Sequence, residues 1–147
     1  MGRSEEEDRA VREEDRTVSG EQGQAETLVL STLPKTWIFD LDGTLVKHNG
    51  YKIDGHDTLL SGAKEYVEGI PGEDKIIILT SRMDEYKDMT LNFLHESGIR
   101  YDEIMFNMPM GERIVVNDRK PVSGIDMAVA VNLDRDAGGY PEVERRL

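Results

Sequence analysis

The sequence predicts an α/β protein with a doubly wound, mainly parallel sheet in three layers, with helices on both faces. Short apolar runs alternate with helical patterns after residue 35, and this alternation is typical of parallel sheets. Several of the apolar runs end in carboxylate, hydroxyl or amide side chains. Because ligands and catalytic groups collect at the carboxyl ends of parallel strands, the same pattern predicts a site at that edge.

The first strand is expected to end at Asp40, since residues 37–39 are an apolar run of strand-forming residues. Asp42 follows, and Gly43 ends the strand in a turn. An Asp-x-Asp pair places both carboxylates on one side of the backbone where strand geometry persists. Crowded like charges are costly, so such a pair usually holds a cation or moves a proton. A solvated Asp-Gly turn is the alternative.

The remaining elements follow in chain order. Apolar residues at helical spacing predict helices near residues 59–69 and 84–97, the second ending at Gly98. Apolar runs rich in strand formers predict four further strands, at residues 75–79, 103–106, 113–116 and 127–133.

Residues 1–31 are expected to lie outside the folded domain, which would span residues 32–147. The segment is strongly acidic and has only Val11 and Val18 as sizeable apolar residues before Leu28, so it cannot bury a core. We expect a disordered or transiently helical extension, and not a signal or transit peptide.

Composition excludes several classes of function. The net charge of -12 argues against nucleic acid as a partner, because that binding depends on clustered lysines and arginines. No apolar run is long enough to span a bilayer. The chain has no cysteine, so disulfides and thiolate zinc sites are excluded, and a cytoplasmic location is the default expectation. The oligomeric state stays open, a homo-oligomer included.

The stretch from Phe39 to Leu45, Phe-Asp-Leu-Asp-Gly-Thr-Leu, resembles the first motif of the haloacid dehalogenase (HAD) superfamily. Most members are magnesium-dependent phosphohydrolases that form an aspartyl phosphate, and the resemblance implies that activity here. Thr80, at the end of the second apolar run, matches the second motif. Asn117-Asp118 resembles the fourth motif, although the family usually has two acids or Gly-Asp at this place.

The resemblance assigns roles to individual residues. Asp40 would attack phosphorus, while Asp42 would protonate the leaving alcohol and then activate water. Mg²⁺ would be held by Asp40, the backbone carbonyl of Asp42 and Asp118, and Thr80 would donate to a phosphoryl oxygen. The residues expected on the substrate side are Thr44, Ser81, Arg82, Lys47 and His48.

The third motif of the family, a lysine that offsets charge at the nucleophile, has no match in the loop of residues 107–112. Lys120 is assigned this catalytic role, because its flexible stem can reach back into the site. Arg82 and Arg113 are the other candidates. For Arg113, an ordinary surface position is preferred, since it stands at the start of a predicted strand and therefore at the wrong edge.

The motif spacing leaves no room for a cap domain, so the likeness, over about residues 35–135, is to the capless HAD group. Residues 46–54 resemble the small hairpin flap of that group, and Asn49-Gly50 is a preferred pair for its tight turn. Within the group, the compact spacing and the Asn-Asp-Arg-Lys-Pro run at 117–121 resemble small phosphatases of capsular polysaccharide biosynthesis. This implies a phosphorylated small molecule, such as a sugar phosphate, as the substrate.

Two other functions share some of these features. A receiver-type signalling domain also has an acidic metal pocket, but its phospho-accepting Asp follows the third strand, where this chain has Met105-Phe106-Asn107. A catalytically weak or inactive HAD-fold binding module is the stronger alternative, because the third-motif lysine is missing from its usual place. Hydrolysis of a generic aryl phosphate separates an enzyme from both.

Overall fold

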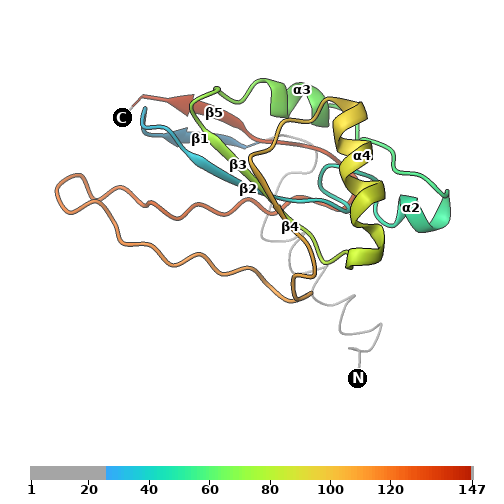
Figure 1. Ribbon diagram of the computed structural model, residues 1–147. Coiled ribbons are helices and arrows are strands. Elements are labelled where there is room, and N and C mark those ends of the chain that lie inside the picture. The colour runs from blue at the N-terminus through green and yellow to red at the C-terminus, as the bar shows by residue number, and fades with distance from the viewer. Residues whose placement is uncertain (1–25, 147) are drawn as a thin grey trace.

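The computed structural model describes residues 26–146, which form two parallel sheets and a set of helices. β2 (Thr36–Asp40), β3 (Lys75–Leu79) and β4 (Glu103–Met105) make one sheet in that order (Figure 1). β1 (Thr27–Leu30) and β5 (Glu142–Arg145) make a separate parallel pair. The prediction of a mixed α/β chain with parallel strands is confirmed.

β3 is the central strand of the three-stranded sheet. Phe39 of β2 is aligned with Ile78 of β3, and Asp40 with Leu79. Ile78 is aligned in turn with Ile104 of β4. The strand is rich in isoleucine, which suits a strand paired on both sides. Because β2 and β3 end level with each other, the residues that follow them emerge at the same edge of the sheet.

The longest helix is α4 (Lys87–Ser97), which a single 3₁₀ turn, η1 (Asp84–Tyr86), precedes. It ends where predicted, since Gly98 has φ 72° and its N–H bonds the carbonyls of the last helical turn. α3 (Ala63–Glu68) is shorter than predicted at its amino end, because Gly62 with φ 82° precedes it. None of the helices in the described part of the chain is long and apolar enough to cross a membrane.

The buried core lies between the helices and one face of the three-stranded sheet. Alternate β3 residues, Ile76 and Ile78, contribute to it, and so do Val67 of α3 and Leu94 of α4. On the opposite face, the Ile38 side chain of β2 is half exposed. Figure 1 shows α3 and α4 on the same side of the sheet. The predicted third layer, with helices on both faces, is therefore not found in residues 26–146.

A long exposed segment replaces the last two predicted strands. The strands predicted at 113–116 and 127–133 are wrong, because residues 107–135 run without strand pairing and largely in solvent. Ile114 is 83% exposed and Val116 is 89% exposed. In Figure 1 this orange segment extends away from α2 and α4. Strand propensity reflects packing on a pleated surface, so an apolar run forms no strand without a partner.

β1 lies in the segment that composition assigns to an extension. Its residues pair in register with β5, as Thr27 does with Glu142 and Leu30 with Arg145. The domain therefore begins before residue 32, and the rest of the predicted extension, residues 1–25, lies outside the described residues. The strand is hard to recognise from composition because its residues alternate between exposed and partly buried.

The predicted hairpin flap at residues 46–54 is wrong. Asn49 does adopt a left-handed conformation (φ 56°), but the short helix α2 (Gly50–Ile53) follows it. The Lys47 N–H donates to the Thr58 carbonyl (2.9 Å) and so closes a longer loop. Val46 pairs antiparallel with Leu59 at the base of this loop, so the chain returns only after α2 and not at the tight Asn-Gly turn that was predicted.

Candidate functional site

The chain turns back on itself directly after β2. Leu45 and Val46 donate their N–H groups to the Leu41 carbonyl, and the Gly43 N–H donates to the Val46 carbonyl (2.7 Å). Gly43 has φ 83°, a region that favours glycine. The apolar members of the turn are buried, so the turn is anchored in the core. Partly exposed between them, at the sheet edge, are Asp40, Asp42 and Thr44.

The residues that follow β3 meet this turn at the same edge. Thr80 is buried; its N–H donates to the Met105 carbonyl, and its Oγ1 accepts from the Arg82 N–H (3.2 Å). Ser81, between them, is partly buried. The Arg82 side chain then reaches Asp42 across the edge. The first and second motifs therefore lie together, as the alternation of strands predicts.

Arg82 uses all five of its N–H donors within the protein. Nε and Nη2 donate to the two oxygens of Asp42 (3.0 and 2.9 Å). Nη1 and Nη2 donate to the two oxygens of Asp57 (2.9 and 2.7 Å), and Nη1 also donates to Thr90 Oγ1 (2.9 Å). A guanidinium has five N–H groups, so none is left for a phosphate oxygen. The predicted phosphate contact of Arg82 is not what the structure shows.

The cluster around Arg82 is buried at one end and open at the other. The side chains of Arg82 and Asp57 are each 1% exposed, whereas that of Asp42 is 18% exposed. Burial lowers the pKa of Arg82, but the hydrogen bonds and charges of Asp57 and Asp42 outweigh it, and the pKa is raised overall. The Tyr51 ring centroid lies 3.9 Å from the guanidinium carbon. Arg82 is therefore a permanently charged, enclosed group.

Asp40 has a separate set of partners. Thr44 Oγ1 donates to Asp40 Oδ2 (3.2 Å), and Arg113 Nη1 donates to Asp40 Oδ1 (2.9 Å). The side chains of Asp40 and Arg113 are 37% and 35% exposed. Of the three candidate cations, Arg113 is thus the one that contacts Asp40, and the preference for a plain surface position is wrong. The error follows from the predicted strand at 113–116, which would place Arg113 at the far edge.

Lys120 and Asp118 lie on the long exposed segment. The Lys120 N–H donates to the Ile125 carbonyl (3.1 Å), and the Asn117 side-chain amide contacts Asp118. Within residues 26–146, no group of three or more histidine or acidic side chains is arranged to hold a metal. The structure therefore does not gather Asp118 with Asp40 and Asp42 into the predicted magnesium set.

A segment near the C terminus fastens the Gly43 turn. The Asp136 N–H donates to the Gly43 carbonyl (2.9 Å), and Asp136 Oδ1 accepts from the His48 N–H (2.8 Å). The Tyr140 hydroxyl donates to the Thr44 carbonyl (2.6 Å), and burial raises the pKa of Tyr140 to about 12. Sequence reasoning missed Asp136 and Tyr140, because bonds to backbone groups leave no pattern in a sequence.

Lys47 and His48, which were predicted to face the substrate, and the neighbouring Lys52 each have a contact within the protein, made in His48 by the backbone N–H and not by the imidazole. Lys47 Nζ lies 2.8 Å from Asp54 Oδ2, in an exposed ion pair. His48 is tied through its backbone N–H, as described above. Lys52 Nζ lies over the rings of Tyr51 and Tyr86, 5.5 and 5.9 Å from their centroids. These side chains border the loop of residues 47–58.

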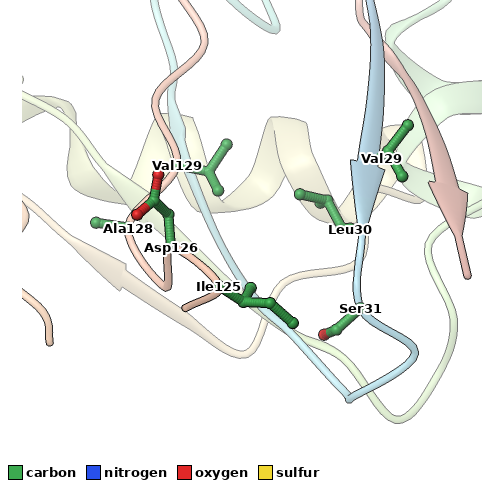
Figure 2. A pocket seen from close by; sticks show the side chains of 7 residues that line it. All are labelled: Val29, Leu30, Ser31, Ile125, Asp126, Ala128 and Val129. Carbon is green, nitrogen blue, oxygen red and sulfur yellow. The ribbon is translucent and has the colours of Figure 1, made fainter. Parts of the chain in front are cut away.

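The hollows on the surface lie away from Asp40. One is formed where β1 faces the returning arm of the long segment (Figure 2); it is lined by Val29, Leu30, Ser31, Ile125, Asp126, Ala128 and Val129. A second lies along the long segment itself, at residues 117–119 and 126–128. Neither of these two hollows includes Asp40, Asp42 or Thr80, so the candidate site lies outside both.

No family model matches the chain, and neither curated proteins nor solved structures gave a match. The fold and the site define an α/β protein with parallel open sheets and two carboxylates at a strand end. Each carboxylate is bonded to a different arginine. The chemistry of the site is therefore argued from its own residues.

Proposed function

We propose that the chain is a phosphomonoester hydrolase in which Asp40 is the nucleophile. The observation that carries the proposal is the set of groups around Asp40, which is partly exposed at a strand end and bonded to Thr44 Oγ1 and Arg113 Nη1. Phosphoryl transfer needs an attacking oxygen with a cation and hydrogen-bond donors beside it. The resemblance of residues 39–45 to the first HAD motif supports the same reaction.

In the proposed reaction, an Asp40 oxygen bonds to phosphorus as the bond from phosphorus to the leaving oxygen breaks. Water then attacks the aspartyl phosphate and releases phosphate and free Asp40. Arg113 offsets charge on the phosphoryl oxygens, in the role first assigned to Lys120. Asp42 gives a proton to the leaving alcohol and takes one from water. Arg82 occupies two of the roughly four acceptor positions of Asp42.

The proposed magnesium ion can be tested separately from the role of Asp40 as nucleophile. A hard cation takes oxygen ligands and keeps several waters, and Asp40 and the Asp42 carbonyl are the oxygen donors at this edge. When bound, the ion would neutralise phosphoryl oxygens. Asp118, the third ligand that the resemblance implies, is not in this group. The variant Asp118→Ala therefore distinguishes an ion held by the sheet edge from one that also needs the long segment.

The proposed substrate class is a phosphorylated small molecule such as a sugar phosphate. The support is the likeness to capless phosphatases and the partial exposure of Asp40, which lies beside the partly exposed Arg113. A panel of phosphosugars, nucleotides and phosphopeptides identifies the class by kcat/KM.

Phosphate release from an aryl phosphate tests the proposal. We expect activity with Mg²⁺ and its loss in excess chelator. Asp40→Asn should lower kcat about 10³-fold or more, because no other group replaces the nucleophile. Asp54→Asn is the matched control, since Asp54 is an exposed aspartate in the neighbouring loop. Full activity of Asp40→Asn would end the proposal.

One observation favours a second function, a binding module without turnover. Both carboxylates of the Asp-x-Asp pair accept from arginines, Asp40 from Arg113 and Asp42 from Arg82. With both carboxylates paired to arginines, the site can bind a phosphate ester through Arg113 without attacking it. Binding of the ester by calorimetry without any phosphate release would establish this function in place of the first.

A further inference from the structure

We infer that Arg82 and Asp57 are positioning residues that hold Asp42 in place for the reaction, an inference that rests on the proposed function. The Arg82 side chain donates to Asp42, Asp57 and Thr90, so its five N–H groups are used away from Asp40. A line of bonds thus runs from buried Asp57, through buried Arg82, to the partly exposed carboxylate of Asp42.

The geometry of Arg82 suits this task. One edge of the guanidinium, Nε and Nη2, binds both oxygens of Asp42, and another edge, Nη1 and Nη2, binds both oxygens of Asp57. Such paired bonds fix direction as well as distance. Since the guanidinium is planar and rigid, the two carboxylates are held in a set orientation to each other. Movement of Asp42 would break two bonds at once.

Arg82 is itself prevented from turning. Thr90 Oγ1 of α4 accepts from Nη1 and donates in turn to the Tyr86 carbonyl (2.7 Å). The Tyr51 ring covers the flat face of the guanidinium. Asp57 comes from the end of the loop that Lys47 and Thr58 close. Two separate parts of the chain, α4 and the loop of residues 47–58, therefore set the place of Arg82, and through it the place of Asp42.

The alternative is that Arg82 binds the phosphate of the substrate directly. That role requires at least one free N–H, and all five are already bonded within the protein. To reach a phosphate oxygen, the guanidinium would have to give up a bond to Asp42, Asp57 or Thr90. Release of Asp57 would leave a buried charge uncompensated, and release of Asp42 would free the carboxylate that the reaction uses. The two roles differ in kinetics, because a phosphate ligand contributes to substrate binding and a positioning residue to the chemical step.

The kinetic test compares Arg82→Lys and Asp57→Asn with two matched controls. Lysine keeps the charge of Arg82 but cannot form two paired contacts. We expect kcat to fall at least about tenfold in both variants with KM within about twofold of the parent. Arg100→Lys is the first control, because Arg100 donates to the backbone carbonyls of Ile70, Pro71 and Asp74 and forms a partly exposed ion pair with Asp102, all away from Asp42. The second control is Asp74→Asn, since Asp74 is a buried aspartate paired with Arg145.

Both controls should keep the parent kcat per folded molecule. A rise in KM of about tenfold or more with kcat unchanged in Arg82→Lys would overturn the inference and make Arg82 a phosphate ligand. An equal fall of kcat in Asp74→Asn would overturn it too, because a general loss of rigidity would then explain the effect.

A second readout needs no turnover, so it separates failure of this inference from failure of the proposed function. The NMR signal of the Arg82 Nε–H should not move on titration with inorganic phosphate, whereas that of Arg113 should. The carboxyl carbon signal of Asp42 should shift in Asp57→Asn and stay unchanged in Asp74→Asn. An unchanged Asp42 signal in Asp57→Asn overturns the inference even where the parent hydrolyses its substrate. A parent without hydrolysis refutes the proposed function, while these signals still decide whether Asp57 sets Asp42.

Discussion

Two buried aspartates at opposite ends of the sheet form the same kind of ion pair and differ in what they connect. Asp57 binds Arg82, which follows the carboxyl end of β3, and Asp74, which precedes the amino end of β3, binds Arg145. Both aspartate side chains are almost fully buried. Arg82 also binds the partly exposed carboxylate of Asp42. Within the described part of the chain, Asp74 and Arg145 bind no comparable carboxylate at the strand ends where Asp40 and Asp42 lie.

The Asp74 cluster joins the two sheets. Asp74 accepts from the Lys35 N–H (3.0 Å) and from Trp37 Nε1 (3.0 Å) at the start of β2, and from Arg145 Nη2 (3.0 Å) on β5. Its bonds therefore end on scaffold groups and not on a reactive side chain. Burial of an ion pair therefore does not show whether the pair serves stability or function. Its role depends on the group to which the pair is bonded at its exposed end.

The largest effect at the amino ends should come from Asp74→Ala. Removing one partner of a buried pair leaves an uncompensated charge, so we expect the free energy of unfolding to fall by about 3 kcal/mol. Urea unfolding measures this, with Asp126→Ala, from an exposed ion pair, as the control. A loss of the parent kcat in the folded fraction of Asp74→Ala would contradict the claim that the Asp74 ion pair serves stability alone.

Deletion of residues 1–30 should have a smaller effect on the same region. It removes β1, the strand partner of β5, and β5 carries Arg145. We expect the Tm to fall by roughly 5 °C, which corresponds to about 1 kcal/mol in a domain of this size. Deletion of residues 1–25 leaves the pairing of β1 intact and is the control. Equal Tm values for both deletions would show that β1 contributes nothing to the scaffold.

The smallest expected effect is a difference in acid stability. Burial raises the pKa of Asp74, but bonds from Trp37, the Lys35 N–H and Arg145 outweigh it, so the folded pKa lies below the ordinary value of 3.8. A depressed folded pKa adds stability that is complete above the unfolded pKa and is lost as the pH falls through the folded pKa.

Urea midpoints of the parent should therefore decrease as the pH is lowered below about 4, and those of Asp74→Asn should decrease less over the same window. Parallel pH curves for the two proteins would remove Asp74 from the account of acid stability. Lys75→Gln, next to Asp74 and exposed, serves as the control for a change of charge alone.

The sequence predicts the parts of the fold that local patterns determine. The apolar run gives β3 with its observed bounds, and the periodic residues give the end of α4 at Ser97, while its first predicted turn, Asp84–Tyr86, is a 3₁₀ turn. The runs at 113–116 and 127–133 have the same local pattern but no strand partner in the described structure. A pattern cannot report whether a partner exists, and this explains why a strand was predicted at both.

The candidate site divides in the same way. Asp40, Asp42 and Thr80 are predictable because each lies at the end of a strand or within two residues after it. Their partners are not, since Arg82 lies 25 residues from Asp57 and Arg113 lies 73 residues from Asp40. The signal that was available for Asp57 was its type alone, an acid two residues after Gly55. Pairing across such distances depends on the fold and cannot be predicted from one sequence.

The most direct test of the central claim is to trap the phosphorylated enzyme. Substrate is mixed with the parent protein, the reaction is stopped with acid, and borohydride is added to reduce any aspartyl phosphate to homoserine. Peptide mass spectrometry then locates the changed residue. The account predicts homoserine at Asp40 in the parent and at no aspartate in Asp40→Asn. Homoserine at another aspartate, or phosphate release with Asp40 unmodified throughout, would contradict it.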